Sequence, residues 1–259
     1  MDIDTIYNMD CLIGMRDIPD KSIDMILCDL PYGTTHNHWD SVIPLDRLWE
    51  QYKRILKKGG VVCLTAQIPF SIDLAQSNRD WLRYEWIWEK NNSTGFLNAN
   101  RMPLKLHENV LVFYETLGTY NPQGVRYNGK RQWSGRPTSS YGVYKTKRDV
   151  TNSYGDFYDG IETMMTNYPV DIIKFAYDTD KVHPTQKPVS LFEYLIRTYT
   201  NEGEVVLDNC MGSGTTAIAC MRSKRHYIGY ELSKEYYDII MNRIASEKNN
   251  IIRRDLFDW

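Results

Sequence analysis

The feature of this sequence that most constrains its fold is a glycine-rich turn that joins an apolar run to a helix-like segment. The stretch reads Val205-Val206-Leu207-Asp208-Asn209-Cys210-Met211-Gly212-Ser213-Gly214-Thr215-Thr216-Ala217. It matches the G-x-G-x-x-G/A pattern, in which the glycines allow a sharp turn and a close approach of the backbone to a ligand. Glu231 follows Gly212 by 19 residues and ends the next strand-like run, a position suited to binding ribose hydroxyls. The pattern predicts a site for a nucleoside-bearing cofactor and leaves a dinucleotide and S-adenosylmethionine both open.

The surrounding pattern of strands and helices predicts an α/β protein. Short apolar runs that end at turns are typical of buried strands, and apolar residues at helical spacing are typical of helices that cover a sheet. Strand-like runs lie at residues 22–28, 61–64, 86–88, 110–113, 204–207 and 226–229. Helical spacing covers 45–56, with Gly59-Gly60 as the expected end of that helix, and begins again at 188 and near 215. We therefore expect a doubly wound, Rossmann-like sheet.

Length and composition limit the domain count and the class of protein. A chain of 259 residues fits one large α/β domain with an insertion as well as it fits two domains. Apolar residues make up 42% and charged residues 25%, so a sizeable core can form and wholesale disorder is excluded. A formal charge of -2 excludes a histone-like protein that grips nucleic acid with its whole surface. Any face that binds nucleic acid has to be local.

The cysteines and the first residues of the chain indicate in which cellular compartment the protein is expected. The five cysteines form no C-x-x-C pair and have no zinc-type spacing, so neither a disulfide framework nor a structural metal is expected. The start, Met1-Asp2-Ile3-Asp4, lacks a basic region followed by an apolar one, and no run approaches the ~18 apolar residues that span a bilayer. We expect a cytoplasmic protein without a membrane partner.

A second turn carries residues suited to holding an amino group of a base. Asp29-Leu30-Pro31-Tyr32 follows the apolar run 22–28. The lone pair of an exocyclic amine is delocalised into the ring, so the amine attacks poorly unless its N–H bonds find acceptors, and the Asp29 carboxylate and the Leu30 carbonyl are two such acceptors. Pro31 favours an extended Leu30, and Tyr32 offers a ring on which a base stacks. An ordinary turn is the alternative.

Two further segments have an unusual composition. His183-Pro184-Thr185-Gln186-Lys187-Pro188 stands directly before a predicted helix, where a proline-bounded helix entry is the simpler interpretation. Residues 120–150 are rich in glycine and tyrosine and hold seven Lys or Arg against one acid, Asp149. Neither segment alone predicts a function.

Together these residues resemble those of the amino-methylating DNA methyltransferases, whose D/N/S-P-P-Y motif handles the target amine and whose F-x-G-x-G motif holds S-adenosylmethionine. Residues 29–32 and 208–214 are the matching segments, and the order of catalytic motif, variable segment, H-P-T-Q-K-P loop and cofactor motif is similar to that of the β group. The resemblance implies a Rossmann-like methyltransferase sheet with an inserted target-recognition region. It also implies S-adenosylmethionine as cofactor, double-stranded DNA as substrate, and direct transfer of the methyl group to the amine.

The resemblance further implies which residues form the site. The catalytic residues are Asp29, Leu30, Pro31 and Tyr32. The cofactor-binding residues are Asp10, Cys11, Asp29, His183, Thr185, Gln186, Lys187, Asp208, Cys210, Met211, Gly212, Ser213, Gly214, Thr215, Glu231 and Leu232. No metal ligand is implied.

Two positions depart from the family motifs. Leu30 replaces the usual first proline, which leaves the inferred role intact because that role uses the backbone carbonyl. Cys210 stands where the family usually has phenylalanine, which shrinks an apolar wall of the cofactor pocket. In this family an Asp-starting motif goes more often with adenine than with cytosine. We therefore expect methylation at N6 of adenine, with N4 of cytosine as the alternative.

By the same resemblance, residues 1–115 form the N-terminal part of the catalytic domain, 116–180 the target-recognition insert, and 181–259 the cofactor-binding part. Residues of the insert that are candidates for contacts with phosphates or guanine edges are Arg126, Lys130, Arg131, Trp133, Arg136, Lys145, Lys147 and Arg148. A solvated surface loop is the alternative for this segment. For His107-Glu108, a charged strand edge and a structural motif of the family both remain open.

Two other classes of protein share part of the pattern. A nicotinamide-dependent oxidoreductase would use Gly212, Gly214 and Glu231 but would leave the Asp29 turn and the basic insert unexplained. A non-catalytic nucleic-acid-binding module would account for the insert but would not need an intact cofactor motif. A homodimer and an accompanying restriction endonuclease are partners that the sequence leaves open, as it does the recognition sequence.

Overall fold

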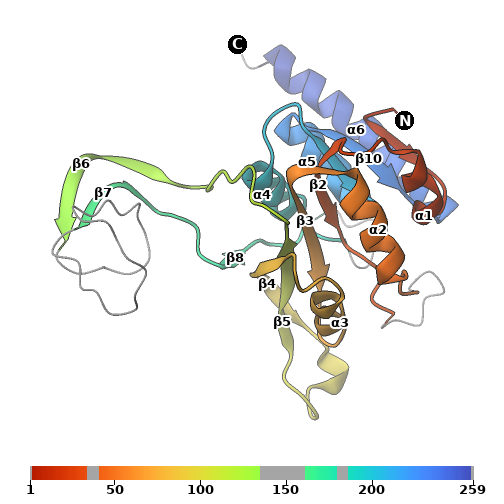
Figure 1. Cartoon of the computed structure of the whole chain (residues 1–259), viewed down its shortest axis with the longest axis horizontal. Helices are drawn as coiled ribbons and strands as arrows, with labels where there is room; N and C mark the ends of the chain where they lie inside the picture. Colours follow the sequence, from red (N-terminus) through yellow and green to blue (C-terminus); the bar gives the residue numbers. More distant parts are fainter. Residues whose placement is uncertain (1, 34–40, 135–160, 180–185, 258–259) are drawn as a thin grey trace. The chain divides into compact units, whose positions relative to one another are not determined.

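A computed structural model of the chain describes residues 2–33, 41–134, 161–179 and 186–257 (Figure 1). The chain divides into two compact units, of which the first comprises Met1–Asn121 with Ile172–Trp259 and the second comprises Pro122–Asp171. In the described part of the second unit, β6 (Arg126–Ser134) pairs antiparallel with β7 (Ile161–Thr166). The first unit contains the main sheet.

This main sheet has eight strands, counted over the described residues. From one edge to the other they are β1 (Thr5–Tyr7), β10 (His226–Tyr230), β9 (Val205–Asp208), β2 (Ile23–Cys28), β3 (Leu56–Ala66), β5 (Lys105–Phe113), β4 (Leu82–Thr94) and β8 (Ile172–Lys174). Neighbouring strands are parallel except for β5, which is antiparallel to both β3 and β4. The β4–β5 pair is therefore a hairpin within an otherwise parallel sheet.

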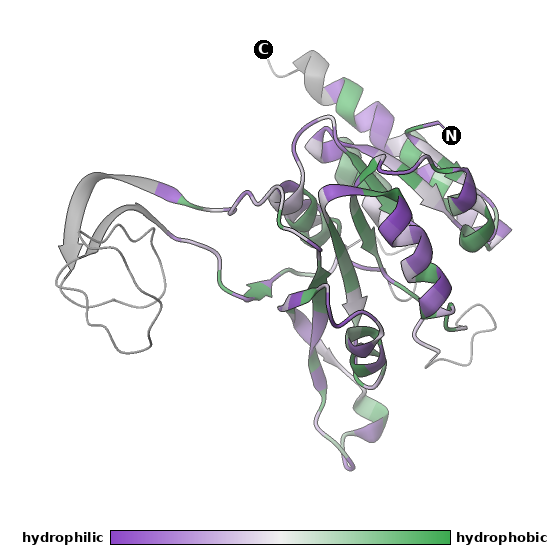
Figure 2. Cartoon of the chain, viewed as in Figure 1, coloured by the Kyte–Doolittle hydropathy of each residue, from purple (hydrophilic) through white to green (hydrophobic). Residues whose placement is uncertain are grey.

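Helices cover both faces of the sheet. One face packs against α4 (Val189–Tyr199), α5 (Thr215–Ser223) and α6 (Lys234–Phe257), and the other against α1 (Cys11–Gly14), α2 (Leu45–Ile55) and α3 (Phe70–Ser77). Met25 of β2 belongs to the first cluster of apolar side chains and Ile26 to the second, because successive side chains of a strand point to opposite faces. The central strands are accordingly among the most hydrophobic segments in Figure 2. This is the doubly wound α/β fold that the sequence predicts.

The predicted elements lie where the apolar patterns indicate, with one correction. The helix expected over 45–56 ends at Ile55, and β3 begins at the next residue, so Gly59 and Gly60 lie inside a strand and do not end the helix. A Cβ atom at Gly60 would lie 2.9 Å from the Asp24 carbonyl and 2.7 Å from the Leu56 side chain. Glycine at position 60 therefore serves the close packing of β3 beside β2.

Two strands far apart in the sequence meet at the centre of the sheet. β2 and β9 pair in parallel, with Met25 opposite Val206 and Ile26 opposite Leu207. Because both strands run in the same direction, the turns that follow them emerge at the same edge of the sheet. The turn at 29–32 and the turn at 208–214 therefore lie side by side.

Within the described ranges, no helix has both the length and the apolar composition that a membrane span needs. All five cysteines are free thiols. The described residues also contain no group of three or more His, Cys, Asp or Glu side chains placed to hold a metal ion.

The close packing of α1 on β10 leads to a prediction about stability. A Cβ atom at Gly14 would lie 2.2 Å from Cε1 of Tyr230, whose side chain is fully buried. The ring has no free space into which it can move, so Gly14→Ala should lower the free energy of unfolding by about 1–3 kcal/mol, measured by urea denaturation. Ile13→Ala removes an exposed side chain from the same helix and should change that energy by less than about 0.5 kcal/mol. Equal stability of Gly14→Ala and the wild type would contradict this packing.

Candidate active site

A cavity of about 760 Å³ opens at the carboxyl edge of the sheet, beside the turns that follow β2 and β9. Its wall also includes residues 9–12 after β1, Gln186 and Lys187 before α4, and residues 231–233 after β10. The volume falls within the range of roughly 300–1,000 Å³ that is usual for small-molecule sites. The position is the one where doubly wound sheets bind their ligands.

The glycine-rich turn depends on two residues in the left-handed region of backbone space. Gly212 has a φ of 53° and Gly214 a φ of 80°, and residues with a side chain are strained there. A Cβ atom at Gly214 would also lie 2.8 Å from the side chain of Ile240 in α6. Gly214 caps the N-terminus of α5, and Gly212 lines the cavity. At Gly212 the backbone of the turn, with no side chain, therefore forms part of the cavity wall.

Glu231 is held at the cavity wall by two backbone groups. The N–H of Gly212 donates to its Oε2 at 2.8 Å, and the N–H of Ser233 donates to its Oε1 at 2.8 Å. Burial raises the pKa of Glu231, and these two hydrogen bonds oppose the shift. A carboxylate has about four acceptor positions, so hydroxyl groups of a ligand can still donate to it. A ribose presents two neighbouring hydroxyl groups of this kind.

A buried carboxyl group and buried thiols lie between the two turns. Asp208 accepts hydrogen bonds from Thr216 Oγ1 at 2.5 Å and from the Cys210 N–H at 3.0 Å, and burial raises the pKa of Asp208 to about 6. Burial also raises the pKa of Cys28 to about 12. A hydrogen bond with Cys210, together with burial, raises the pKa of Cys11. The thiols of Cys11 and Cys28 therefore stay protonated at neutral pH and do not act as nucleophiles.

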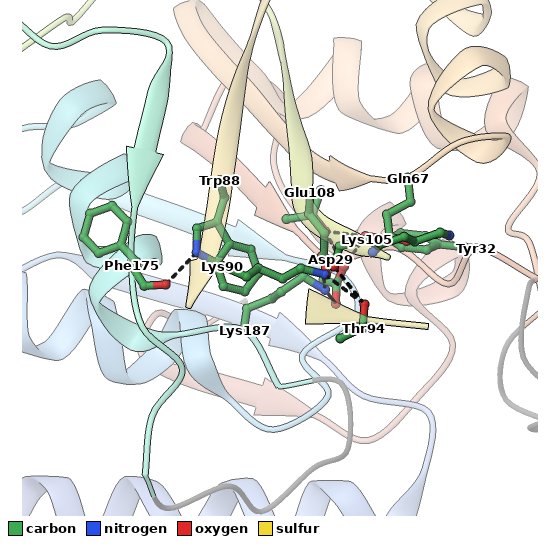
Figure 3. A network of polar contacts seen from close by, with 11 residues as sticks. Asp29, Tyr32, Gln67, Trp88, Lys90, Thr94, Lys105, Glu108, Phe175 and Lys187 are labelled. Carbon is green, nitrogen blue, oxygen red and sulfur yellow. Dashed lines mark hydrogen bonds and ion pairs between the residues drawn. The ribbon is translucent and has the colours of Figure 1, made fainter. Parts of the chain in front are cut away.

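Asp29 is held by donors from three parts of the chain, of which Figure 3 labels Tyr32 and Lys187. Its Oδ1 accepts hydrogen bonds from the hydroxyl groups of Tyr32, at 2.8 Å, and of Thr65, and its Oδ2 accepts one from Lys187 Nζ at 2.6 Å. Three donors fix the carboxylate and leave one acceptor position on Oδ2. The Leu30 carbonyl, on a residue that lines the cavity, receives no hydrogen bond from the described residues. Asp29 Oδ2 and the Leu30 carbonyl thus both keep acceptor positions.

Tyr32 has a structural role that the sequence does not indicate. Its hydroxyl group donates to Asp29 and lies 3.0 Å from Thr65 Oγ1, and its ring stacks on Phe70 with centroids 5.1 Å apart. Burial, reinforced by the charge of Asp29, raises the pKa of Tyr32 well above its usual range. The hydroxyl group therefore stays protonated and orients the Asp29 carboxylate.

Two carboxylates and two lysines form an alternating row of charges that begins at Asp29 and continues through Lys187 and Glu108 to Lys90. Lys187 Nζ lies 2.6 Å from Asp29 Oδ2 and 3.3 Å from Glu108 Oε2, and Lys90 Nζ lies 3.3 Å from Glu108 Oε1. The contact between Lys187 and Glu108 Oε2 is an ion pair without the geometry of a hydrogen bond. Burial opposes ionisation of Lys187, but the carboxylates of Asp29 and Glu108 outweigh it and raise its pKa. The four charges cancel, which is the condition for placing them together away from water.

Most residues predicted for the site surround this one cavity. The residues found in its wall are Asp10, Cys11, Asp29, Leu30, Pro31, Tyr32, Gln186, Lys187, Asp208, Cys210, Met211, Gly212, Ser213, Thr215, Glu231 and Leu232. Gly214 lies next to the wall as the N-cap of α5. His183 and Thr185 lie outside the described residues.

The residues predicted to contact DNA belong to the second unit. Arg126, Lys130, Arg131 and Trp133 lie in β6, and Arg136, Lys145, Lys147 and Arg148 lie outside the described residues. The second unit, Pro122–Asp171, falls within the predicted insert 116–180. That this insert recognises DNA stays a prediction.

Sequence reasoning misses Lys90 and Thr65 and leaves Glu108 undecided. Glu108 is only 6% exposed and faces both lysines, so the alternative of a charged strand edge is wrong for this residue. The spacing along the two strands could have indicated that Lys90 and Glu108 are buried. Lys90 follows buried Trp88 by two positions, and Glu108 precedes buried Val110 by two. Side chains two apart share a face of a strand, so both charges continue a buried row.

Comparison with known proteins identifies the family. The sequence model of the family described as DNA methylase matches residues 23–242. The DNA adenine methyltransferase YhdJ of Escherichia coli (strain K12) is 26% identical over 253 residues, which cover 93% of this chain and 82% of that protein.

Two solved structures share the fold. The crystal structure of the M1.HpyAVI–SAM complex has a TM-score of 0.60 at 23% identity and covers 92% of this chain and 98% of that one. The PvuII DNA methyltransferase, described as cytosine-N4-specific, has a TM-score of 0.65 at 16% identity and covers 96% of this chain and 92% of that one. Because the family match spans most of the chain and includes both turns of the cavity wall, this chain belongs to the N6/N4 DNA methylase family of amino-methylating DNA methyltransferases.

Proposed function

We propose that this protein transfers a methyl group from S-adenosylmethionine to N6 of adenine in double-stranded DNA. The observation that carries the proposal is that Asp29 and Leu30 line the same cavity as the glycine-rich turn at 208–214. Family membership supports transfer of a methyl group to an amine of DNA. The choice of adenine is supported by the aspartate that starts the motif and by the name of the Escherichia coli relative.

The cavity suits S-adenosylmethionine in size and in its polar groups. Glu231 keeps acceptor positions for two ribose hydroxyls, and Gly212 leaves room at the wall. When bound, this cofactor supplies a methyl group on a cationic sulfur, which leaves as a neutral thioether when an amine nitrogen attacks the methyl carbon. The carboxyl group of Asp208 lines the same cavity and complements a cation there.

The residues of the Asp29 turn activate the amine. Donation of its two N–H bonds to the Leu30 carbonyl and to Asp29 Oδ2 localises the lone pair on the nitrogen. Positive charge develops on that nitrogen during transfer, so a fixed Asp29 carboxylate stabilises the transition state more than the neutral ground state. The methylated nitrogen then releases one proton, for which Asp29 is the adjacent acceptor. Positioning supplies the rest of the rate, and no covalent enzyme intermediate is required.

Methylation at N4 of cytosine is the second candidate, because a cytosine amine can use the same two acceptors and an N4-specific enzyme shares the fold. DNA from cells that express the protein, sequenced with detection of modified bases, tests the choice and reveals the recognition sequence. N4-methylcytosine would contradict adenine as the target, and unmodified DNA would contradict methyl transfer to DNA.

Family membership speaks against a nicotinamide-dependent oxidoreductase and a non-catalytic binding module. A homodimer, a restriction endonuclease partner and a cytoplasmic location stay predictions.

Removing the charge of Asp29 should separate chemistry from cofactor binding. In Asp29→Asn the side chain keeps its shape but no longer stabilises positive charge on the nitrogen, so kcat should fall by about 100-fold or more. The Kd for S-adenosylmethionine, measured by calorimetry, should change less than about threefold. Asp73→Asn alters an exposed residue of α3 and should leave both values unchanged. Turnover of Asp29→Asn near the wild-type rate would remove Asp29 from the mechanism.

Glu231 should act on the cofactor and not on the chemical step. In Glu231→Gln, the amide NH2 must face one of the two backbone N–H groups that the carboxylate now accepts, and acceptor positions for ribose are lost. The Kd for S-adenosylmethionine should rise by about tenfold or more, with kcat little changed at saturating cofactor. Glu235→Gln, at an exposed position of α6, is the control. An unaltered Kd would show that Glu231 does not bind the ribose.

Lys187 should act through Asp29 and so lower kcat more than cofactor affinity. Lys187→Met removes the donor to Asp29 Oδ2, while Glu108 keeps Lys90 as its partner. We expect kcat to fall by about 10- to 100-fold through loss of positioning. Lys57→Met, which breaks a surface ion pair with Asp24, serves as the matched control. A large loss of cofactor affinity with normal kcat would assign Lys187 to the cofactor instead.

A further inference from the structure

The hairpin between β4 and β5 ends in two apolar side chains that are almost fully exposed. Phe96 is 80% exposed and Leu97 is 99% exposed, more than any other large apolar side chain among the described residues. Met102, Leu104 and Leu106 on the same hairpin are exposed as well. Exposed apolar side chains gathered at one point of a soluble protein mark a contact with another molecule.

The tip of this hairpin is an ordered turn. Gly95 adopts a left-handed φ of 89° and precedes the short 3-10 helix η2 (Phe96–Asn98). The N–H of Asn98 donates to the Gly95 carbonyl at 2.9 Å, the N–H of Ala99 to the Phe96 carbonyl at 3.0 Å, and the N–H of Met102 to the Asn98 carbonyl at 3.0 Å. Phe96 and Leu97 are thus presented by a hydrogen-bonded backbone, so little conformational entropy is lost when they bind.

The hairpin rises from the rim of the cavity. Ala66, the last residue of β3, lies opposite Asn109, which lies opposite Ile87. The hairpin beyond these residues therefore projects past the carboxyl edge of the sheet (Figure 1), with an irregularity in its strand pairing between Glu89 and Thr94. Thr94 near its tip lines the cavity, as does Gln67, which accepts a hydrogen bond from Lys105 at 3.1 Å.

The charges of the hairpin favour a polyanion as the partner. No Asp or Glu occurs between Lys90 and His107, and Arg101 and Lys105 are exposed beside the apolar tip. Phosphate groups pair with such cations. Phe96 and Leu97 by themselves are far too small a surface for a stable protein interface, which buries roughly 1,200–2,000 Å², and the polar residues Asn98, Asn100 and Arg101 separate them from Met102 in the chain. Single apolar side chains do, however, act as wedges between the base steps of a duplex.

We propose that the tip, residues 95–102, inserts Phe96 and Leu97 into the DNA duplex beside the target base and holds open the place that this base leaves. The inference rests on the proposed function, since a base can reach Asp29 only by leaving its stack, and the duplex must then lie over the carboxyl edge from which the hairpin projects. Arg101 and Lys105 contact phosphates on either side. The wedge lowers the cost of keeping the base in the cavity.

The test uses the full-length enzyme and two duplexes that carry its methylation site, as found by sequencing DNA from expressing cells. In one duplex the target base is paired, and in the other it faces a mismatched base, which costs less to unstack. The wedge variant is the double substitution Phe96→Ser, Leu97→Ser. Ile252→Ser replaces an exposed apolar side chain of α6 and is the matched control. Calorimetry with S-adenosylmethionine shows that each variant is folded, and light scattering reports its oligomeric state.

We expect kcat/KM of the wedge variant to fall by about tenfold or more on the paired duplex and by less than about threefold on the mismatched one, with cofactor affinity and oligomeric state unchanged. The control should match the wild type on both duplexes. Equal losses on the two duplexes, or no loss, would overturn the wedge. If equal losses came with a change of oligomeric state, the wedge would also be overturned, and the tip would instead belong to an interface between two copies of the chain. If the wild type methylates neither duplex, the proposed function fails and this inference fails with it.

Discussion

The parallel pairing of β2 with β9 is the constraint on which the site depends. These strands are separated by most of the chain, yet Met25 lies opposite Val206 and Ile26 opposite Leu207. A shift of this register would move the Asp29 turn along the sheet relative to the glycine-rich turn and would reverse which side chains face each helical layer. The core therefore holds the two turns in place: the apolar side chains that alternate along β2 select the register, and the register sets where the Asp29 carboxylate stands.

A second level of positioning acts on Asp29 itself. Its carboxylate takes hydrogen bonds from its own turn through Tyr32, from β3 through Thr65, and from the segment before α4 through Lys187. Because Lys187 also contacts Glu108 of β5, and Glu108 contacts Lys90 of β4, the orientation of the Asp29 carboxylate depends on five segments. Buried ionised groups contribute little net stability. In the proposed function their value is that the carboxylate is oriented before an amine binds, so that the reaction requires no reorganisation of this group.

Much of this architecture is encoded in local patterns, and the rest is not. The strand and helix periods, and the glycines and proline that punctuate the two turns, predict the doubly wound fold and bring Asp29 and Gly212 to one edge. The end of α2 at Ile55 is not predicted, because Gly60 does not end the helix. A glycine is needed at position 60 because the backbone of Asp24 in β2 lies too close for a side chain. The pairing of Lys90 with Glu108 depends on the register of β4 with β5, where Trp88 lies opposite Glu108, and no local pattern specifies that register.

The burial of Asp208 has a thermodynamic consequence for the cavity. Its pKa in the folded protein is about 6, raised from 3.8 by burial, so the ionised form costs stability. That cost is absent below the pKa of the unfolded chain and grows to about 3 kcal/mol as the pH rises through 6. A cation bound in the same cavity favours the ionised carboxylate and recovers part of this free energy. Occupancy and protonation of Asp208 are thus linked: below about pH 6, a cation that binds in this cavity should release a proton from this carboxyl group.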